Sequence, residues 1–193
     1  LQAMGHTPMI LTRGYKSTDG RSDEAMLLET LTGAPVIVNP DRVSGAAEAV
    51  GKGADVLVMD DGFQHVRLRR DLNVVLIDAT DPFGGGWCLP AGLLREPLGA
   101  LRDAGVVVIT RSDQMRPEVC EAIERKVRRR TAAPILRASH APSEFRTLTG
   151  DTAPLESLAG ESLAAFCGLG NPAGFFATLE TLDVELVETT HCP

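Results

Sequence analysis

The sequence lacks the features that would assign it to several common protein classes. No apolar run approaches the ~18 residues that a membrane-spanning helix needs. Its four cysteines include no Cys-x-x-Cys pair, so neither a zinc ribbon nor a disulfide framework is indicated, and a reducing, cytosolic compartment is expected. Basic residues are not in excess, because 19 Lys and Arg stand against 26 Asp and Glu and the net charge is −7. We therefore expect no nucleic acid among its partners, since phosphate-backbone binding needs a basic surface.

What the sequence does contain is a repeated alternation of short apolar runs and helical segments. The chain has 193 residues, of which 44% are hydrophobic, and this is enough to bury a core. Runs rich in β-branched residues occupy positions 8–12, 35–39, 55–60, 73–79, 105–110, 133–138, 162–168 and 184–189. These runs are continuous rather than alternating, which is typical of strands buried on both faces of a parallel sheet. The pattern predicts a doubly wound α/β fold with a mostly parallel sheet.

Three segments between these runs predict helices. One begins at Ser22, a suitable N-cap, and continues with two acids in its first turn. A second, "PEVCEAIERKVRRR", places Val119, Ile123 and Val127 on one face. A third, "NPAGFFATLETL", has Asn171 as its N-cap, followed by proline at the first helical position. All three read as ordinary packing helices.

Two irregular segments divide the chain. Residues 80–97 are rich in Gly and Pro and follow no helical or strand period, and a loop of that length in a compact domain is usually functional or disordered. Residues 139–160 are also irregular. We therefore predict a core domain over 1–138, a linker over 139–160 and the start of a second, smaller α/β domain over 161–193.

Two adjacent aspartates, Asp60 and Asp61, follow the apolar run "VLVM" directly. In open α/β sheets, ligands bind outside the carboxyl ends of the strands, which is where these acids would lie. Neighbouring carboxylates repel each other unless a cation neutralises them or one takes up a proton. Mg²⁺ fits this position, because it is held by one or two carboxylates together with phosphate oxygens. The alternative is an ordinary turn at the end of a strand.

Three further groups point to phosphate chemistry, each with a simpler alternative. "TRGYK" places Arg13 and Tyr15 at the end of a strand, where they could grip phosphate or sugar, or form a basic turn. Asp23 lies in the first turn of a predicted helix, where it could also complement the helix dipole. "LLREP" places Arg95 and Glu96 at the end of the long loop, where a surface ion pair is the alternative.

The motifs together resemble a known family. "DDGFQHVRLRRDLNVVLIDATDPFGGGWCLPAGLLREPL", with "TRGYK…SDEAMLL" before it and "FCGLGNPAGFFATLETL" after it, resembles the tetraacyldisaccharide 4'-kinases of the lipid A pathway over essentially the whole chain. The resemblance implies a P-loop NTPase type of fold. It implies ATP-dependent phosphorylation, with Mg²⁺, of the 4'-hydroxyl of a tetraacyl-glucosamine disaccharide 1-phosphate. The implied partners are this lipid A disaccharide precursor and the anionic inner-membrane surface, at the cytoplasmic face of the bacterial inner membrane.

The resemblance also implies roles for individual residues. Asp60 and Asp61 correspond to the Walker-B acids that organise Mg²⁺, and Glu96 would lie near the metal. Asp23 corresponds to the acid that helps to deprotonate the attacking hydroxyl. The residues expected to line the substrate site are Arg13, Tyr15, Gln64, His65 and Arg95. The combination suits phosphoryl transfer, which depends on positioning and on charge neutralisation.

Some parts of the family pattern are not found in these residues. No G-x-x-x-x-G-K-[ST] motif occurs, and the P-loop and an N-terminal membrane-associating helix are expected to precede residue 1. The family's Asp-His-His segment is expected to follow Pro193, and we do not assign its role to His191. The chain is therefore expected to be a fragment that is inactive by itself.

Three other functions remain open from the residues alone. "VVVITRSD" is similar to a guanine-reading motif, with Asp113 as the base-binding acid, and this would indicate a GTPase-like protein. "FCGLGNPA" fits G-x-G-x-x-A through Gly168 and Gly170, with Glu188 ending the next predicted strand, as in an NAD-binding oxidoreductase. A non-catalytic binding module is the third.

Two surface features have two interpretations each. The basic run Arg67, Arg69 and Arg70 is either solvated charge or a contact for anionic lipid or the substrate phosphate. The apolar residues of the long loop either line a surface for acyl chains or pin the loop to the core, and we expect the core for most of them and leave Trp87 open. These residues are Phe83, Trp87, Leu89, Leu93 and Leu94.

Overall fold

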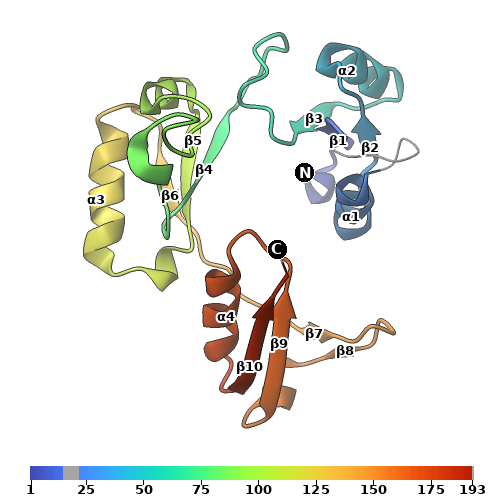
Figure 1. The fold of residues 1–193 in the computed structure, drawn as a ribbon. Coiled ribbons are helices and arrows are strands. Elements are labelled where there is room, and N and C mark those ends of the chain that lie inside the picture. The colour runs from blue at the N-terminus through green and yellow to red at the C-terminus, as the bar shows by residue number, and fades with distance from the viewer. Residues whose placement is uncertain (15–21, 193) are drawn as a thin grey trace. The chain divides into compact units, whose positions relative to one another are not determined.

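The computed structural model describes residues 1–14 and 22–192 (Figure 1). The chain divides into two compact units, Leu1–Asp71 and Leu72–Pro193. Both are α/β units, and apart from one short antiparallel pair all the described strand pairs are parallel. The α/β class and the parallel pairing that the sequence predicts are therefore confirmed for the described residues.

The first unit is a small parallel sheet with two helices. Its elements are the 3-10 helix η1 (Gln2–Met4), β1 (Pro8–Thr12), α1 (Asp23–Thr32), β2 (Val36–Val38), α2 (Arg42–Gly51) and β3 (Val56–Met59). The strand order is β2-β1-β3, with Ile10 opposite both Val36 and Val58. Every residue of β1 is buried, as a central strand covered on both faces requires.

Close packing of α2 on the sheet depends on small residues. Ala46 and Ala49 are buried and pack in one cluster with Leu11 and Ile37. A Cβ atom on Gly45 would lie 2.6 Å from Cδ1 of Leu11, so a side chain there would force the helix away from the sheet. The close approach of α2 to the sheet therefore depends on the small residues Gly45, Ala46 and Ala49.

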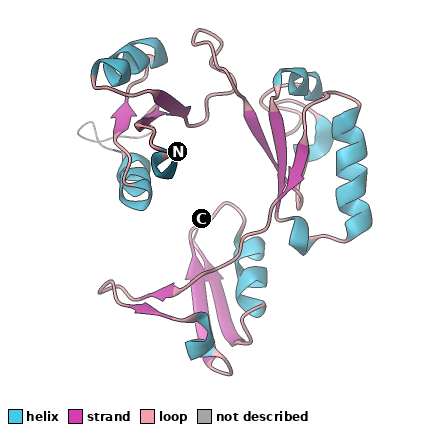
Figure 2. Ribbon diagram, turned by 180° about the vertical axis from the view of Figure 1, so that it is seen from behind, coloured by secondary structure: helices cyan, strands magenta, loops and turns pink. Residues whose placement is uncertain are grey.

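The second unit contains another parallel sheet (Figure 2). Its first part consists of β4 (Val74–Asp78), η2 (Gly84–Gly86), η3 (Leu98–Asp103), β5 (Val106–Thr110), η4 (Ser112–Gln114), α3 (Pro117–Arg128) and β6 (Ile135–Arg137). The strand order is β4-β5-β6. Val107 and Ile109 of β5 are fully buried against Ile123 and Val127 of α3, which confirms the face predicted for this helix. Half-buried Val119 packs against the same cluster.

The remainder of this unit comprises a hairpin and a second parallel pair. Its elements are β7 (Phe145–Arg146), β8 (Thr152–Ala153), η5 (Leu155–Leu158), β9 (Ser162–Cys167), α4 (Pro172–Glu180) and β10 (Glu185–His191). β7 and β8 are antiparallel, whereas β9 and β10 are parallel. Asn171 caps α4, because its Oδ1 accepts a hydrogen bond from the backbone N–H of Gly174 at 2.9 Å, as the sequence predicts.

Two expectations about strands are wrong in detail. Val74 and Leu76 of β4 are 53% and 66% exposed, so this strand alternates between a covered and an uncovered face instead of being buried on both. β10 runs to His191, so Glu188 lies inside the strand beside a register shift and does not end it.

The predicted linker 139–160 contains the β7–β8 hairpin and η5, while the boundary between the compact units falls after Asp71. The assignment of domains at 139–160 stays a prediction.

Candidate functional site

The first unit brings several predicted site residues to one edge of its sheet. Because β1, β2 and β3 are parallel, their carboxyl ends lie at the same edge. The chain leaves this edge at Arg13 after β1, at Asn39 after β2 and at Asp60 after β3. Ligands of open parallel sheets bind outside such an edge.

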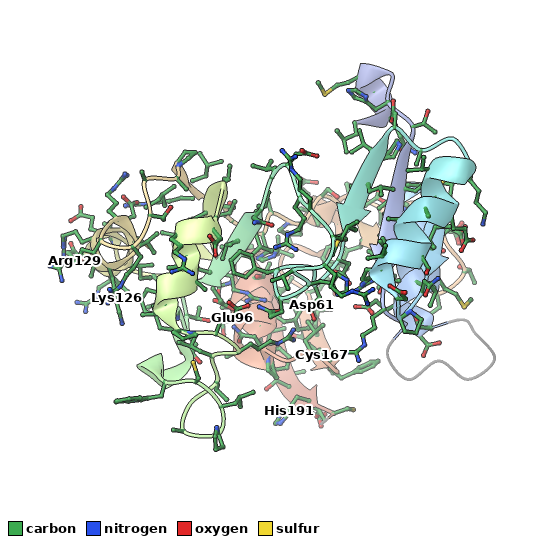
Figure 3. The ribbon with its side chains drawn as sticks, turned by 90° about the horizontal axis from the view of Figure 1, so that it is seen from above. Asp61, Glu96, Lys126, Arg129, Cys167 and His191 are labelled. Atoms are coloured by element: carbon green, nitrogen blue, oxygen red, sulfur yellow. The ribbon has the colours of Figure 1, made fainter. Side chains whose placement is uncertain are left out.

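Asp60 and Asp61 have different backbone conformations. The N–H of Asp60 donates to the carbonyl of Leu11 at 3.1 Å, which continues the pairing of β3 with β1. Asp61 follows in the left-handed region at φ 47°, which is uncommon for a residue with a Cβ. The next residue must be small, since a Cβ on buried Gly62 would lie 2.8 Å from Cβ of Met59. The chain therefore turns sharply at Asp61, which is exposed (labelled in Figure 3).

Arg42 is a site residue that the sequence reasoning missed. It is only 5% exposed, and its Nη2 donates a hydrogen bond to the main-chain carbonyl of Asp60 at 3.1 Å. Burial lowers the pKa of its guanidinium from the ordinary value, while the charges of Asp60 and Asp61 act in the opposite direction. Nη1 is also buried, and no hydrogen-bond partner for it exists among the described residues. A buried cation thus lies beside the two aspartates.

A sequence signal for Arg42 did exist. "VIVNPDR" places this arginine four residues after the end of β2, at the first position of α2, whose N-cap Asp41 accepts from the N–H of Val43 at 3.1 Å. An arginine at a strand-to-helix connection on the carboxyl edge could have been included with the aspartates. Its burial could not have been read from the sequence, because arginine is rarely buried without a partner.

The start of α1 also reaches this edge. Arg13 lowers the pKa of Arg42 and Glu24 raises it, so both charges lie within electrostatic range of the buried guanidinium. Asp23 is the first residue of α1 and is exposed, and the preceding Ser22 is buried and accepts from the N–H of Ala25 at 3.2 Å. The predicted N-cap is confirmed. The catalytic role proposed for Asp23 stays a prediction.

The segment after the aspartates folds around Arg70. Arg70 donates to the carbonyls of Phe63 at 3.2 Å and Leu68 at 3.4 Å, and also to that of His65. Nε2 of His65 is buried and has no hydrogen-bond partner among the described residues, whereas Gln64 is exposed.

The basic run therefore does not act as one surface. Arg70 satisfies main-chain carbonyls of its own loop. Arg67 lies 3.9 Å from Asp41 and is exposed, as is Arg69.

Three predicted residues lie outside the described part of the first unit. Tyr15 lies outside the described residues. Arg95, which is exposed, and Glu96, which is half-buried, belong to the second unit and precede η3. The assignment of Glu96 to the metal site stays a prediction. Within the described part of the chain, no group of three or more His, Cys, Asp or Glu side chains could hold a metal ion.

The second unit has its own polar cluster at the carboxyl ends of β4 and β5. Asp78 ends β4 and forms an ion pair with Arg111, which follows β5 at φ 52°. Partial burial of the Asp78 carboxyl opposes ionisation, but hydrogen bonds from Thr80 and the charge of Arg111 outweigh it and lower the pKa. Nδ2 of Asn171 donates to Oγ1 of Thr80 at 3.0 Å and so ties the start of α4 to the end of β4.

Residues that a GTPase or an NAD-binding oxidoreductase would use have structural roles in or beside this cluster. Arg111, in the position of the guanine-motif lysine, pairs with Asp78, while Asp113 is exposed in η4. The Gly168–Gly170 turn leads into the Asn171 cap of α4. Cys167 and His191 are paired across β9 and β10 at one end of that sheet (Figure 3).

No described helix is both long and apolar enough to cross a membrane.

Comparison with known proteins assigns the family. A sequence profile described as Tetraacyldisaccharide-1-P 4'-kinase matches residues 1–193. A protein named Tetraacyldisaccharide 4'-kinase from Anaeromyxobacter sp. (strain K) is 40% identical, and the match covers 96% of this chain and 54% of that protein. Proteins of the same name from Syntrophus aciditrophicus (strain SB) and Alkalilimnicola ehrlichii (strain ATCC BAA-1101 / DSM 17681 / MLHE-1) are 38% and 37% identical, each over 97% of this chain and over 58% and 56% of their own lengths.

The chain spans about half the length of these curated relatives. No solved structure gives a significant match. The family match covers both compact units, including the aspartates after β3 and the Asn171 cap of α4. The chain belongs to the Tetraacyldisaccharide-1-P 4'-kinase family.

Proposed function

We propose that the protein containing this chain transfers the γ-phosphate of ATP to the 4'-hydroxyl of a tetraacyl-glucosamine disaccharide 1-phosphate, on a fold of the P-loop NTPase type. The family supports this reaction, because its relatives carry the name Tetraacyldisaccharide 4'-kinase. The observation that carries the proposal is the position of Asp60 and Asp61, at the carboxyl edge of a parallel sheet and beside the buried Arg42. Neither a GTPase nor an NAD-binding oxidoreductase finds support in the family.

The donor set fits Mg²⁺. Asp60 and Asp61 supply two carboxylates, and Mg²⁺ commonly takes one or two carboxylates and completes its shell with water and phosphate oxygens. A bound Mg²⁺ would neutralise charge on the transferred phosphate. We include Glu96 as a further candidate ligand on the strength of its family motif.

Arg42 has two roles in this proposal. Through Nη2 it fixes the main chain at Asp60, and its charge lowers the cost of holding two carboxylates side by side. Its buried Nη1 has no hydrogen-bond partner among the described residues, and we assign to it an anionic oxygen of a phosphate. The guanidinium stays charged at any working pH, so this contribution does not depend on protonation.

The remaining residues orient the acceptor. We propose that Asp23 accepts the proton of the attacking hydroxyl, since it is exposed at the first position of α1, whose first turn lies near Arg42. Arg13 would attract phosphate at the same edge. The candidate substrate-binding residues are Arg13, Tyr15, Gln64, His65 and Arg95. A lipid acceptor also implies peripheral action at the cytoplasmic face of the bacterial inner membrane, against its anionic surface.

The test is phosphate transfer from labelled ATP to the tetraacyl acceptor in detergent micelles, with the complete protein that contains this chain. The double variant Asp60→Asn, Asp61→Asn is expected to lose at least about 100-fold in kcat/KM. Asp55→Asn is the matched control, because Asp55 lies at the amino end of the same strand, where it accepts from the N–H of Thr7 at 2.7 Å. Activity of the double variant within twofold of the control would overturn the proposal.

A further inference from the structure

The end of α3 carries the densest group of cations in the chain. Residues 125–130 contain five Lys or Arg and no acid, in a chain whose net charge is −7. All five are exposed, whereas Val127, which lies among them, is fully buried against the sheet. Figure 3 shows Lys126 and Arg129 at this end of the helix. We call the five residues the α3 basic surface: Arg125, Lys126, Arg128, Arg129 and Arg130.

Local pairing does not account for these charges. Arg125 lies 3.6 Å from Glu121 and Arg128 lies 3.7 Å from Glu124, and such exposed pairs are weak. Glu124 also accepts a hydrogen bond from Nε of Arg137 at 2.8 Å, so it is shared between two arginines. Stabilisation of the helix end by its dipole accounts for cations in the last turn, but not for Arg130, which follows the cap.

The long loop 80–97 places apolar side chains in the same unit. The ammonium group of Lys126 lies 4.1 Å from the ring centre of Phe83, so the start of the loop lies against α3. Phe83 is half-buried and packs against the core cluster. Leu94 is also half-buried. Trp87, Leu89 and Leu93 are 71%, 63% and 69% exposed and so lie outside the core. The expectation that most apolar residues of the loop pin it to the core is therefore wrong.

Hydrogen bonds within the loop hold its backbone in the conformation that exposes these three side chains. The N–H of Leu93 donates to the carbonyl of Gly84 at 2.9 Å, and the N–H of Leu94 donates to the carbonyl of Trp87 at 3.1 Å. A Cβ on Gly92 would lie 2.3 Å from the carbonyl oxygen of Trp87, so the two arms of the loop touch here. A backbone closed in this way cannot turn the three side chains inward without breaking these contacts.

We propose that the α3 basic surface and the exposed side chains of Trp87, Leu89 and Leu93 form a docking surface for a bilayer of anionic phospholipids. The cations would contact head groups, while the tryptophan and leucines would enter the interface, which is the usual division for proteins that lie on a membrane. Charge complementarity favours this partner, because the surface is basic in an acidic chain. The choice of a lipid partner rests on the proposed function.

A nucleic acid fits the same surface less well. Leucines have no aromatic face on which a base could stack, and two of the three exposed apolar residues are leucines.

The experiment is co-sedimentation of the complete protein with vesicles of 70% phosphatidylcholine and 30% phosphatidylglycerol, in 0.1 M NaCl and without ATP or acceptor. The variant Arg125→Gln, Arg129→Gln, Arg130→Gln is expected to bind about 100-fold more weakly, since each cation near an anionic surface contributes roughly fivefold. The matched control is Lys52→Gln, Arg102→Gln, Arg146→Gln, which makes the same change in charge at exposed sites elsewhere and is expected to bind like the wild type. Thermal unfolding by circular dichroism establishes that both variants are folded.

A second measurement tests the apolar part. Vesicles should shift tryptophan emission to the blue, and the Trp87→Phe variant should lose that shift. Equal vesicle binding by the α3 variant and its control, or an emission shift that persists without Trp87, would overturn the proposal. Binding to duplex RNA in preference to these vesicles would also overturn it, in favour of a nucleic-acid partner. Because the assays contain no ATP and no acceptor, failure of the kinase proposal leaves their results unchanged.

Discussion

The buried guanidinium of Arg42 donates a hydrogen bond to the main-chain carbonyl of Asp60, at 3.1 Å from Nη2. This contact joins the first turn of α2 to the end of β3, at the point where the chain turns sharply through Asp61. The same side chain lies within the fields of Arg13, Glu24 and Asp61. One buried cation therefore joins α2 to the end of β3, within electrostatic range of charges that follow β1 and begin α1.

Replacement of Arg42 by methionine is expected to reduce phosphate transfer much more than stability. Methionine retains the apolar stem and removes the cost of burying a charge, so the free energy of unfolding should change by only about 1 kcal/mol. Loss of the cation beside the aspartates should lower kcat by about 100-fold. Activity assays and urea unfolding measure the two effects, and Arg69→Met, at an exposed arginine, is the control. A full-rate Arg42→Met enzyme would contradict the proposed role.

Two glycines of α2 are expected to respond oppositely to alanine. A Cβ on Gly45 would lie 2.6 Å from Cδ1 of Leu11 and 3.0 Å from Cβ of Asn39, so Gly45→Ala should destabilise the protein by about 1–3 kcal/mol. Gly51 meets nothing within 4 Å, and Gly51→Ala should stabilise by about 0.5–1 kcal/mol because it restricts the unfolded chain. Urea unfolding of both variants is the measurement. Equal effects at the two positions would show that α2 does not approach the sheet closely.

Asn171 has two functions that substitutions can separate. Its Oδ1 caps α4, and its Nδ2 donates to Oγ1 of Thr80. Asn171→Ser retains a capping oxygen and loses the contact with Thr80, at a cost of about 0.5–1.5 kcal/mol. Asn171→Ala loses both and should cost about 1 kcal/mol more. If chemical denaturation gives the same stability for the two variants, the cap contributes nothing.

Stability should depend on pH through Asp78 in acid. Folding lowers the pKa of this carboxyl below its ordinary value of 3.8, so the ionised form favours the folded state. The resulting stabilisation is fully present above the unfolded value, near pH 4, and is lost as the pH falls through the folded pKa. The stability difference between the wild type and Asp78→Asn, followed by urea unfolding from pH 2 to 7, should therefore shrink below about pH 4.

An additional variant tests the cause of this dependence on pH. Arg111→Gln removes the positive charge that helps to lower the pKa of Asp78, so the difference in stability between aspartate and asparagine at position 78 should be smaller in that background. A difference that stays constant down to pH 2 would contradict the assignment to Asp78.

Most of the secondary structure was predictable, because it depends on residues that are close together in the sequence. Continuous β-branched runs predicted β1 at its observed bounds, and an N-cap followed by proline predicted the start of α4. The position of Asp60 and Asp61 at the carboxyl edge of a parallel sheet followed from their place after such a run. The family also followed from the sequence, because its motifs are extended and occur in order.

The errors concern burial, which depends on how the helices and strands pack against one another. The apolar pattern of β4 did not predict that Val74 and Leu76 would be exposed. The same run of apolar residues can occur in a strand that is covered on both faces of the sheet and in one that is covered on a single face. The burial of Arg42 was likewise invisible, because it depends on α2 meeting the end of β3. For the basic run, the sequence offered solvated charge or a contact for an anion, and neither interpretation included the hydrogen bonds that Arg70 donates to three main-chain carbonyls.

The sequence by itself determined α1, α3 and α4, the parallel strands and the family, since these depend on side-chain periodicity, capping and ordered motifs along the chain. It did not predict α2 or the antiparallel β7–β8 hairpin. Only the tertiary structure decided which charges are buried and which apolar side chains are exposed. It placed Arg42 beside the aspartates, and it left Trp87 exposed in a closed loop. The physical reason is that burial depends on contacts between residues distant in the sequence, and one side chain's own chemistry does not specify its neighbours.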